Sequence, residues 1–188
     1  MGLPEGDTKE GALRGLTETL AKARTPYALI GGVAVQLYTQ EPRTTVDLDV
    51  ALASYDDLPR VALAAAGFTH EKRFGHSDNW RAPGAEPRRQ RTAVPFTVDT
   101  LTPGTVERAH LLRVRTMRIR VAALEDLVLL KLAAAEEPQR RPSKRLSDLR
   151  DVLALLEEHP ELDTRMPDAR QRLARASRRA TRAGTRSS

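Results

Sequence analysis

The feature that most constrains this chain is an ordered pattern of an apolar run, a glycine pair, a helical stretch and two alternating acids. Residues 27–30 (YALI) are typical of a short buried strand, and Gly31-Gly32 is typical of a tight turn. Residues 33–39 continue as a helix. Residues 44–52 (TTVDLDVAL) then alternate apolar and acidic side chains, which is the period of a strand. The pattern predicts a strand, a glycine turn, a helix and a second strand.

The two acids of the second strand, Asp47 and Asp49, are two residues apart. Successive side chains of a strand face opposite sides, so both carboxylates share one face, about 6.6 Å apart along the strand. Like charges at this separation raise each other's proton affinity unless a cation stands between them. Mg²⁺ fits, because it takes hard oxygen ligands and leaves positions open for water and substrate phosphates. Asp47 and Asp49 are therefore the predicted metal ligands.

A third acid, Asp99, lies in a second convincing strand over residues 94–101 (VPFTVDTL). If the two acid-bearing strands are neighbours, Asp99 completes a three-carboxylate cluster that can hold two ions about 3.5–4 Å apart. Asp99 would then bind the first ion and act as the general base, or help it.

Gly31 and Gly32 stand where a strand meets a helix. Without Cβ atoms, their backbone N–H groups can approach a phosphate, and the positive end of the helix favours its charge. A glycine pair alone is more often an ordinary turn, and an isolated Asp-x-Asp is more often an exposed polar face. The combination in this order, with a strand acid further on, is much more specific.

The segment GGVAVQLYTQEPRTTVDLDV and the later FTVD resemble the motifs of DNA polymerase beta-like nucleotidyltransferases, above all the minimal, AbiEii-type members linked to toxin–antitoxin and abortive-infection systems. The resemblance implies an α+β fold with a small mixed sheet, flanking helices and a helical C-terminal part. It also implies that Asp47, Asp49 and Asp99 bind magnesium, with two ions expected, and that Gly31 and Gly32 hold the triphosphate of an NTP.

Two further motif residues precede the paired acids. Arg43 would bind a substrate phosphate or buttress Asp47 and Asp49. Thr45 alternates onto the same strand face as the two acids. Both are counted among the predicted nucleotide-binding residues.

The later helices resemble the same family. Lys131 is the only polar residue in the apolar run LVLLKLAAA, and it lies on the helix face that carries Leu124 and Val128. It is predicted to contact the nucleotide phosphates as a catalytic residue, or to pair with Asp148 or Asp151; the alternative is a lysine that extends along the helix edge into water.

Asp148 is also predicted to bind the nucleotide. The alternative is a surface acid that pairs with Arg145 or Arg150.

The predicted activity is a magnesium-dependent transfer of a nucleoside monophosphate from an NTP to an acceptor hydroxyl. The acceptor is left open between RNA, with tRNA suggested by the toxin-type members, a protein side chain and a small molecule. A toxin would have a cognate antitoxin as partner. Two alternatives stay open: an inactive member that serves as a binding partner or antitoxin, and an aminoglycoside-type antibiotic nucleotidyltransferase.

Charge divides the chain into two predicted parts. Residues 165–188 hold eight arginines and one acid, while residues 1–164 hold 23 basic and 24 acidic groups, or −1. We therefore predict a nucleotidyltransferase domain over 1–160 and a basic tail over 161–188 that is disordered or a frayed helix. The tail is either a solvated terminus or a grip for RNA, DNA or an acidic partner.

The chain has no cysteine, no apolar run of membrane-spanning length and no signal-peptide pattern at its start, so a cytoplasmic protein without a membrane partner is expected. The remaining predicted elements are helices over 8–24, 56–66, 124–136 and 144–158, a polar loop over 75–90 and a strand over 113–121.

Overall fold

The computed structural model describes residues 8–41, 47–84, 91–98 and 103–184. Its centre is a mixed sheet with the strand order β3-β4-β5-β2-β1-β7-β6. The strands are β1 (Ala28–Leu29), β2 (Val50–Leu52), β3 (Thr69–Phe74), β4 (Ser77–Arg81), β5 (Ala93–Val98), β6 (His110–Val114) and β7 (Met117–Val121). The helices are α1 (Thr8–Lys22), α2 (Gly31–Thr39), η1 (Tyr55–Asp57), α3 (Arg60–Ala65), α4 (Thr105–Arg108), α5 (Leu124–Glu136), α6 (Pro142–Glu158), α7 (Leu162–Arg165) and α8 (Ala169–Gly184).

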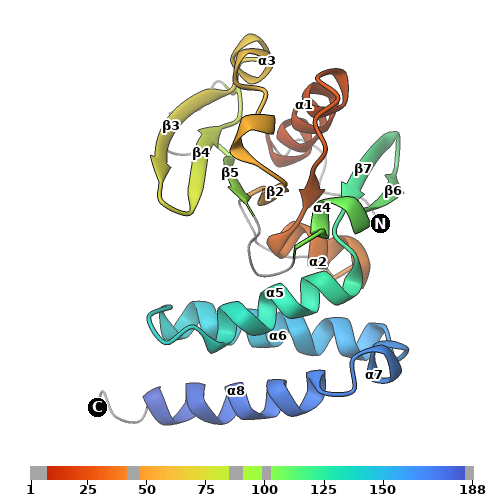
Figure 1. Ribbon diagram of the computed structural model, residues 1–188, viewed down its shortest axis with the longest axis vertical. Coiled ribbons are helices and arrows are strands. Elements are labelled where there is room, and N and C mark those ends of the chain that lie inside the picture. The colour runs from red at the N-terminus through yellow and green to blue at the C-terminus, as the bar shows by residue number, and fades with distance from the viewer. Residues whose placement is uncertain (1–7, 42–46, 85–90, 99–102, 185–188) are drawn as a thin grey trace.

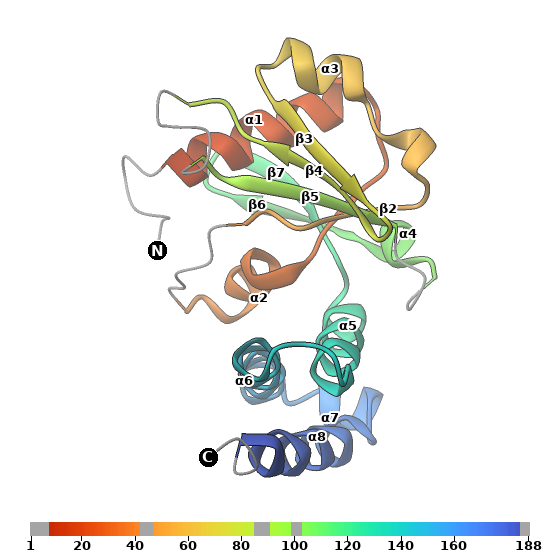
Figure 2. The ribbon, with the colours of Figure 1, turned by 90° about the vertical axis from the view of Figure 1, so that its left-hand side faces the viewer.

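The sheet combines parallel and antiparallel neighbours. β1 runs antiparallel to β2 and parallel to β7, while β2 runs parallel to β5. Helices α1 and α3 lie on one side of the sheet and α2 on the other, with α5, α6 and α8 grouped beyond α2 (Figure 1, Figure 2). This mixed α/β architecture confirms the predicted fold class.

The core explains why the N-terminal helix forms where its apolar spacing predicts. Leu13, Leu16 and Leu20 of α1 are fully buried with the sheet residues Leu29 and Ile119. Side chains three and four residues apart share one helix face, so α1 can cover the sheet with a single apolar stripe. Among the described residues, no helix is long and apolar enough to cross a membrane.

The two paired acids precede β2 instead of lying inside it, since the strand begins at Val50. The backbone before it is still held by the neighbouring strands: Ile30 N–H donates to the Asp49 carbonyl oxygen at 2.9 Å, and Leu48 N–H donates to Ala93 O at 2.9 Å. Leu48 is buried between two half-buried acids. The predicted alternation therefore holds even though the strand is shorter.

The predicted helix over 56–66 is wrong in its first half. Residues 55–57 form the short 3₁₀ helix η1, closed by a capping box between Ser54 and Asp57, and α3 begins only at Arg60. Pro59 separates the two because proline lacks an N–H and restricts the residue before it.

Part of the predicted polar loop over 75–90 is a strand. Residues 77–81 form β4, which pairs with both β3 and β5. The polar side chains are satisfied inside the sheet layer: the buried Asp78 carboxylate accepts from Trp80 Nε1 at 2.8 Å and from Arg60 Nη2 at 2.9 Å. Trp80 is only 4% exposed. Its ring therefore packs as part of the hydrophobic core.

The single strand predicted over 113–121 is two strands, β6 and β7, joined at Arg115-Thr116. Arg115 has φ of 53°, in the left-handed region used by tight hairpin turns. The sequence offers no glycine or asparagine at the turn, which is why the hairpin was not predicted.

The C-terminal region differs from the predicted disordered or frayed tail. Residues 169–184 form α8, and Ala169, Ala176 and Ala180 are buried. Leu173, Ala176 and Ala180 pack with Ala135 of α5 and Leu149 of α6. Alanine provides a helix face that is small enough for close packing, so a segment with few large apolar residues is still ordered. The boundary at 160 stays a prediction.

Candidate active site

The glycine turn and the second acid of the pair meet in space. Gly31 follows β1 and begins α2 with φ of 72°, a conformation that side chains rarely adopt. A Cβ added there would lie 2.6 Å from Asp49 Cγ, closer than atoms approach. Gly31 is therefore required for two reasons: its positive φ and the Asp49 carboxylate packed against it.

The beginning of α2 adds positive potential to this position. Its N-cap residue, Ile30, has no side chain that could bond the first N–H groups of the helix. Uncapped N–H groups and the helix dipole both favour an anion. Gly32, the next residue, is buried.

Asp49 carries the strongest electrostatic signal of the two acids. The pKa of its carboxyl is raised to about 6, mainly by burial and in smaller part by the negative charge of Asp47. The positive charges of Lys131, Lys144 and Arg140 oppose this rise. The fold thus places the Asp49 carboxylate within electrostatic reach of three cations from a different part of the chain.

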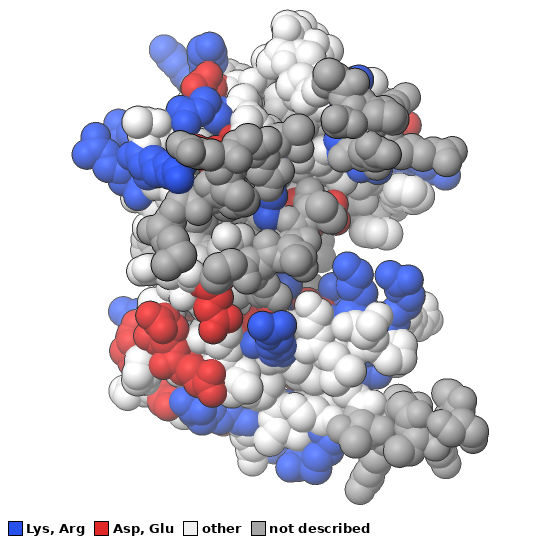
Figure 3. Space-filling view, turned by 180° about the vertical axis from the view of Figure 1, so that it is seen from behind, with Lys and Arg blue, Asp and Glu red and all other residues white. Residues whose placement is uncertain are grey.

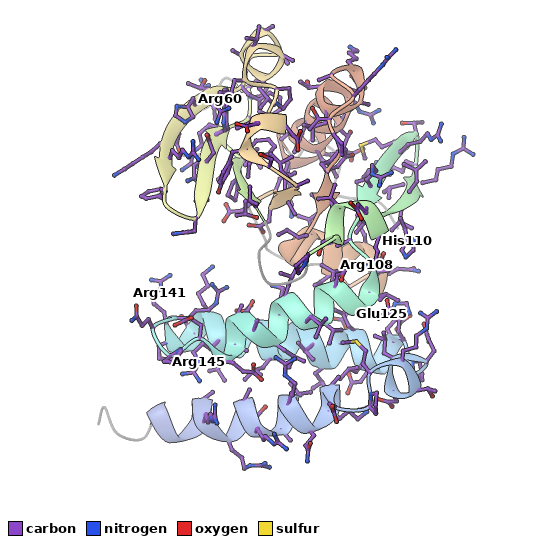
Figure 4. All side chains as sticks on the ribbon, in the orientation of Figure 1. Arg60, Arg108, His110, Glu125, Arg141 and Arg145 are labelled. Atoms are coloured by element: carbon purple, nitrogen blue, oxygen red, sulfur yellow. The ribbon has the colours of Figure 1, made fainter. Side chains whose placement is uncertain are left out.

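Those cations come from the helical C-terminal part. Lys131 lies on α5, Arg140 in the connection between α5 and α6, and Lys144 in the first turn of α6. The connection lies at the end of the helix pair where Figure 4 labels Arg141 and Arg145. Lys144 is exposed, while Lys131 has a side chain only 14% exposed.

Two acids of α6 fix the position of Lys131. Its Nζ lies 2.9 Å from Asp148 Oδ1 and 2.8 Å from Asp151 Oδ2. Burial alone would lower the pKa of Lys131, but the charges of Asp151 and Asp148 hold it above its ordinary value. Arg140 Nε donates to the other oxygen of Asp148 at 2.6 Å. Lys131 therefore stays charged, and Asp148 joins two of the cations that act on Asp49.

The structure brings together several of the predicted site residues. At one end of β1 and β2 lie Asp47, Asp49, Gly31 and Gly32. The positive charge of Lys131, which is paired with Asp148, acts on Asp49. The sequence predicted that Lys131 contacts the nucleotide phosphates or pairs with Asp148 or Asp151. The structure shows the ion pair, with both acids. Arg43, Thr45 and Asp99 lie outside the described residues.

The two described acids suit a magnesium ion in their chemistry. Hard carboxylate oxygens are the ligands that Mg²⁺ takes, and a cation would relieve the repulsion that contributes to the raised pKa of Asp49. Within the described ranges, no three His, Cys, Asp or Glu side chains form a group that could hold a metal ion. The strand that leads to Asp99 is β5, the parallel neighbour of β2, as the three-acid prediction requires.

Sequence reasoning missed Arg140 and Lys144 as parts of the site. The signal available was the cluster of cations QRRPSKR between the lysine helix and the acidic helix. In the sequence, that segment is typical of a solvated loop. In the structure, the charges of Arg140 and Lys144 act on Asp49.

Comparison with solved structures shows which fold this chain shares with known proteins. The fold resembles that of an antigenic nucleotidyltransferase-like protein from Paracoccidioides brasiliensis with a TM-score of 0.56 at 20% identity, covering 93% of this chain and 95% of that one. It resembles ANT(2'')-Ia, solved with adenylyl-2''-tobramycin, with a TM-score of 0.62 at 12% identity, covering 92% and 99%. A lincomycin-bound lincosamide antibiotic adenylyltransferase, LnuA, gives 0.53 at 15% identity, covering 78% and 95%. The shared feature is the nucleotidyltransferase fold.

The family model described as "Nucleotidyl transferase AbiEii toxin, Type IV TA system" matches residues 14–187. The chain therefore belongs to the AbiEii nucleotidyl transferase family. No curated protein sequence matches it at a significant level.

Proposed function

We propose that this protein transfers a nucleoside monophosphate from an NTP to an acceptor hydroxyl, in a magnesium-dependent reaction, as the toxin of a toxin–antitoxin pair. The new bond joins the acceptor oxygen to the α-phosphorus, and the bond from the α-phosphorus to the β-phosphate oxygen breaks. Pyrophosphate leaves, and the acceptor hydroxyl gives up its proton. The observation that carries the proposal is the Asp49 carboxylate packed against Gly31, at the uncapped beginning of α2.

The residues divide into an acidic and a basic half. Asp47 and Asp49 would hold two Mg²⁺ ions, and Asp99 would complete the cluster as a ligand of the first ion, the one beside the acceptor oxygen. The metal, when bound, would neutralise the phosphates and make the α-phosphorus easier to attack. Asp99 would also receive or relay the proton of the acceptor hydroxyl.

The basic half would bind the triphosphate. The α2 N-terminus provides N–H donors, and Gly31 and Gly32 let a phosphate come close to them. Lys131, Arg140 and Lys144 supply positive charge from the opposite side, and Arg43 and Thr45 add a cation and a hydroxyl from the segment before Asp47. Asp148 acts by holding Lys131 and Arg140 in place.

The direct test is label transfer. The protein is incubated with each α-³²P-labelled NTP and Mg²⁺, with total RNA, with lysate protein and with an aminoglycoside as separate acceptors. We expect label on one acceptor class, loss of at least 100-fold in Asp49→Asn, and little change in the matched control Asp163→Asn, an exposed acid paired with Arg170.

Other results would overturn the proposal. Absence of both transfer and magnesium-dependent NTP binding would favour an inactive binding partner. Label on the aminoglycoside alone would replace the toxin role with antibiotic modification.

A further inference from the structure

A second charged surface lies on the β6–β7 hairpin, away from the candidate active site. Leu111 and Arg113 of β6 and Arg118 and Arg120 of β7 alternate onto one face. Arg113 lies directly opposite Arg118, and Leu111 lies opposite Arg120. Three guanidinium groups therefore share one side of a two-stranded ribbon.

The repulsion between these positive charges destabilises the hairpin unless an anion neutralises them. Directly opposed like charges destabilise a strand pair, because their Cβ atoms are only about 4.5–5.5 Å apart. Within the described residues, Arg113 and Arg118 form no ion pair. The neighbouring Arg14 and Arg115 differ, since both reach Glu10, at 3.6 Å and 3.1 Å.

The hairpin face continues into an open hollow of about 550 Å³. Arg24, in the turn after α1, lines it together with Arg118 and Arg120. The other lining residues are apolar or neutral: Leu20, Ala21, Thr25, Pro26, Tyr27 and Leu111. None is acidic, and Leu111 is 51% exposed. Lys and Arg side chains gather at the β6–β7 edge of the molecule in Figure 3.

One of these arginines is held rigidly. Arg120 Nη2 donates to Val106 O at 3.0 Å, and its Nε donates to Tyr27 O at 3.3 Å. Arg24 has no ion pair with a described residue and takes a left-handed backbone angle of 54°. The hollow thus combines one fixed guanidinium with others that are available to a ligand.

We propose that the face formed by Arg24, Arg113, Arg118 and Arg120 docks the phosphodiester backbone of a nucleic-acid strand. Cations spaced about 5–7 Å apart along and across the hairpin suit a polymer with regularly repeated negative charges. Guanidinium groups bind phosphate oxygens through paired hydrogen bonds. The apolar wall with Leu111 offers contact to sugars and bases.

The surface leads toward the candidate active site. Val121, the residue after Arg120, pairs with Leu29 of β1, and Ala122 N–H donates to Leu29 O at 3.0 Å. Gly31 follows two residues later. A nucleic-acid strand bound to the hairpin would therefore lie near β1, the strand that leads to Gly31 in the candidate active site. The docking itself does not depend on transferase activity.

The test measures binding of a fluorescent 20-nucleotide RNA, the same DNA sequence and an acidic peptide, from 50 to 300 mM salt. For Arg113→Gln with Arg118→Gln, we expect RNA or DNA affinity to fall at least 10-fold at 100 mM salt, with the salt slope smaller by about 1.4–1.8. The matched control is Arg175→Gln with Arg178→Gln, which removes the same charge from exposed positions of α8. It should change affinity less than 3-fold.

A second variant separates binding from folding. Arg113→Glu creates an opposite-charge pair with Arg118, so it should raise the melting temperature while it weakens nucleic-acid binding. Equal losses in the hairpin and α8 variants, a loss in the α8 variant alone, or a preference for the acidic peptide would each overturn the proposal. Loss of NTP transfer in Asp49→Asn with RNA binding retained would leave it standing.

Discussion

The surroundings of Asp49 disfavour its charged form when no cation is bound. It is half-buried against Gly31, close to the negative charge of Asp47, with a pKa of about 6. Residues of this kind, whose environment opposes their charged form, are common at functional sites.

The raised pKa gives a pH dependence whose sign is fixed. The folded protein binds this proton more tightly than the unfolded chain, so the metal-free protein loses stability as pH rises from about 4 through about 6, by about 2–3 kcal/mol. Asp49→Asn, which stays neutral, should therefore melt at a higher temperature than wild type at pH 8 and not at pH 4. Thermal melts in EDTA measure this. A variant less stable than wild type at pH 8 would contradict it, and Mg²⁺ should stabilise only the wild type.

Gly31→Ala should damage the site more than an ordinary glycine substitution. The positive φ costs about 1–2 kcal/mol for a side chain, and the added Cβ would overlap the Asp49 carboxylate. We expect a lower melting temperature and loss of magnesium-dependent NTP binding by calorimetry. Gly11→Ala is the control, because nothing lies within 4 Å of its Cβ in helix α1. It should preserve binding, and retained binding in Gly31→Ala would refute the close approach.

At the level of elements, the pair α5 and α6 is joined through charge as well as through apolar packing. Lys131 lies between Asp148 and Asp151, which are 2% and 1% exposed. Removing one partner of a buried ion pair is costly because the other charges stay behind without compensation.

Lys131→Met should therefore destabilise the protein by about 3–5 kcal/mol at pH 7. Asp151→Asn in the same chain should restore part of this, since it removes one of the charges left behind. Urea unfolding of both single variants and the double variant gives the coupling energy. If the two changes simply add, Lys131 and Asp151 do not interact as the structure indicates. Transfer activity should stay low in the double variant, because the cation that we propose to bind phosphate is gone.

Among the helices and strands, the long helices were predicted best from the sequence. Helix α5 runs from Leu124 to Glu136, as the apolar spacing predicts, and α1 begins at the predicted Thr8. Long periodic helices are set by local pattern. The β6–β7 hairpin and the β4 strand were missed because Arg115-Thr116 is an unusual turn and because Asp78 is polar but buried. Its partners make that burial possible: Trp80 lies on the same strand, but Arg60 and His70 come from other segments.

For the whole molecule, α8 belongs to the folded protein. Its alanine face packs on α5 and α6, while Arg170 and Arg172 pair with Asp163 and Glu136. The acidic side chains gathered near α7 in Figure 3 are part of this charge balance. The basic tail is thus partly neutralised by the body.

Deleting residues 169–188 should lower the urea midpoint clearly, because Leu149 and Ala135 lose their cover. Neutralising Arg175 and Arg178 to glutamine should leave it nearly unchanged, since both side chains are exposed. Circular dichroism during urea titration measures both. An unchanged midpoint in the truncated chain would mean that α8 adds nothing to stability.

By itself, the sequence determined the motif residues and the class of fold. The order of glycine pair, helix and alternating acids depends on local geometry: a positive φ, a helix period and a strand period are readable from neighbouring residues. Only the tertiary structure decided which charges act together. Asp49, Lys131 and Lys144 are far apart along the chain, and their interaction depends on how α5 and α6 pack beyond α2. The opposition of Arg113 and Arg118 likewise depends on a hairpin register that no local pattern specifies.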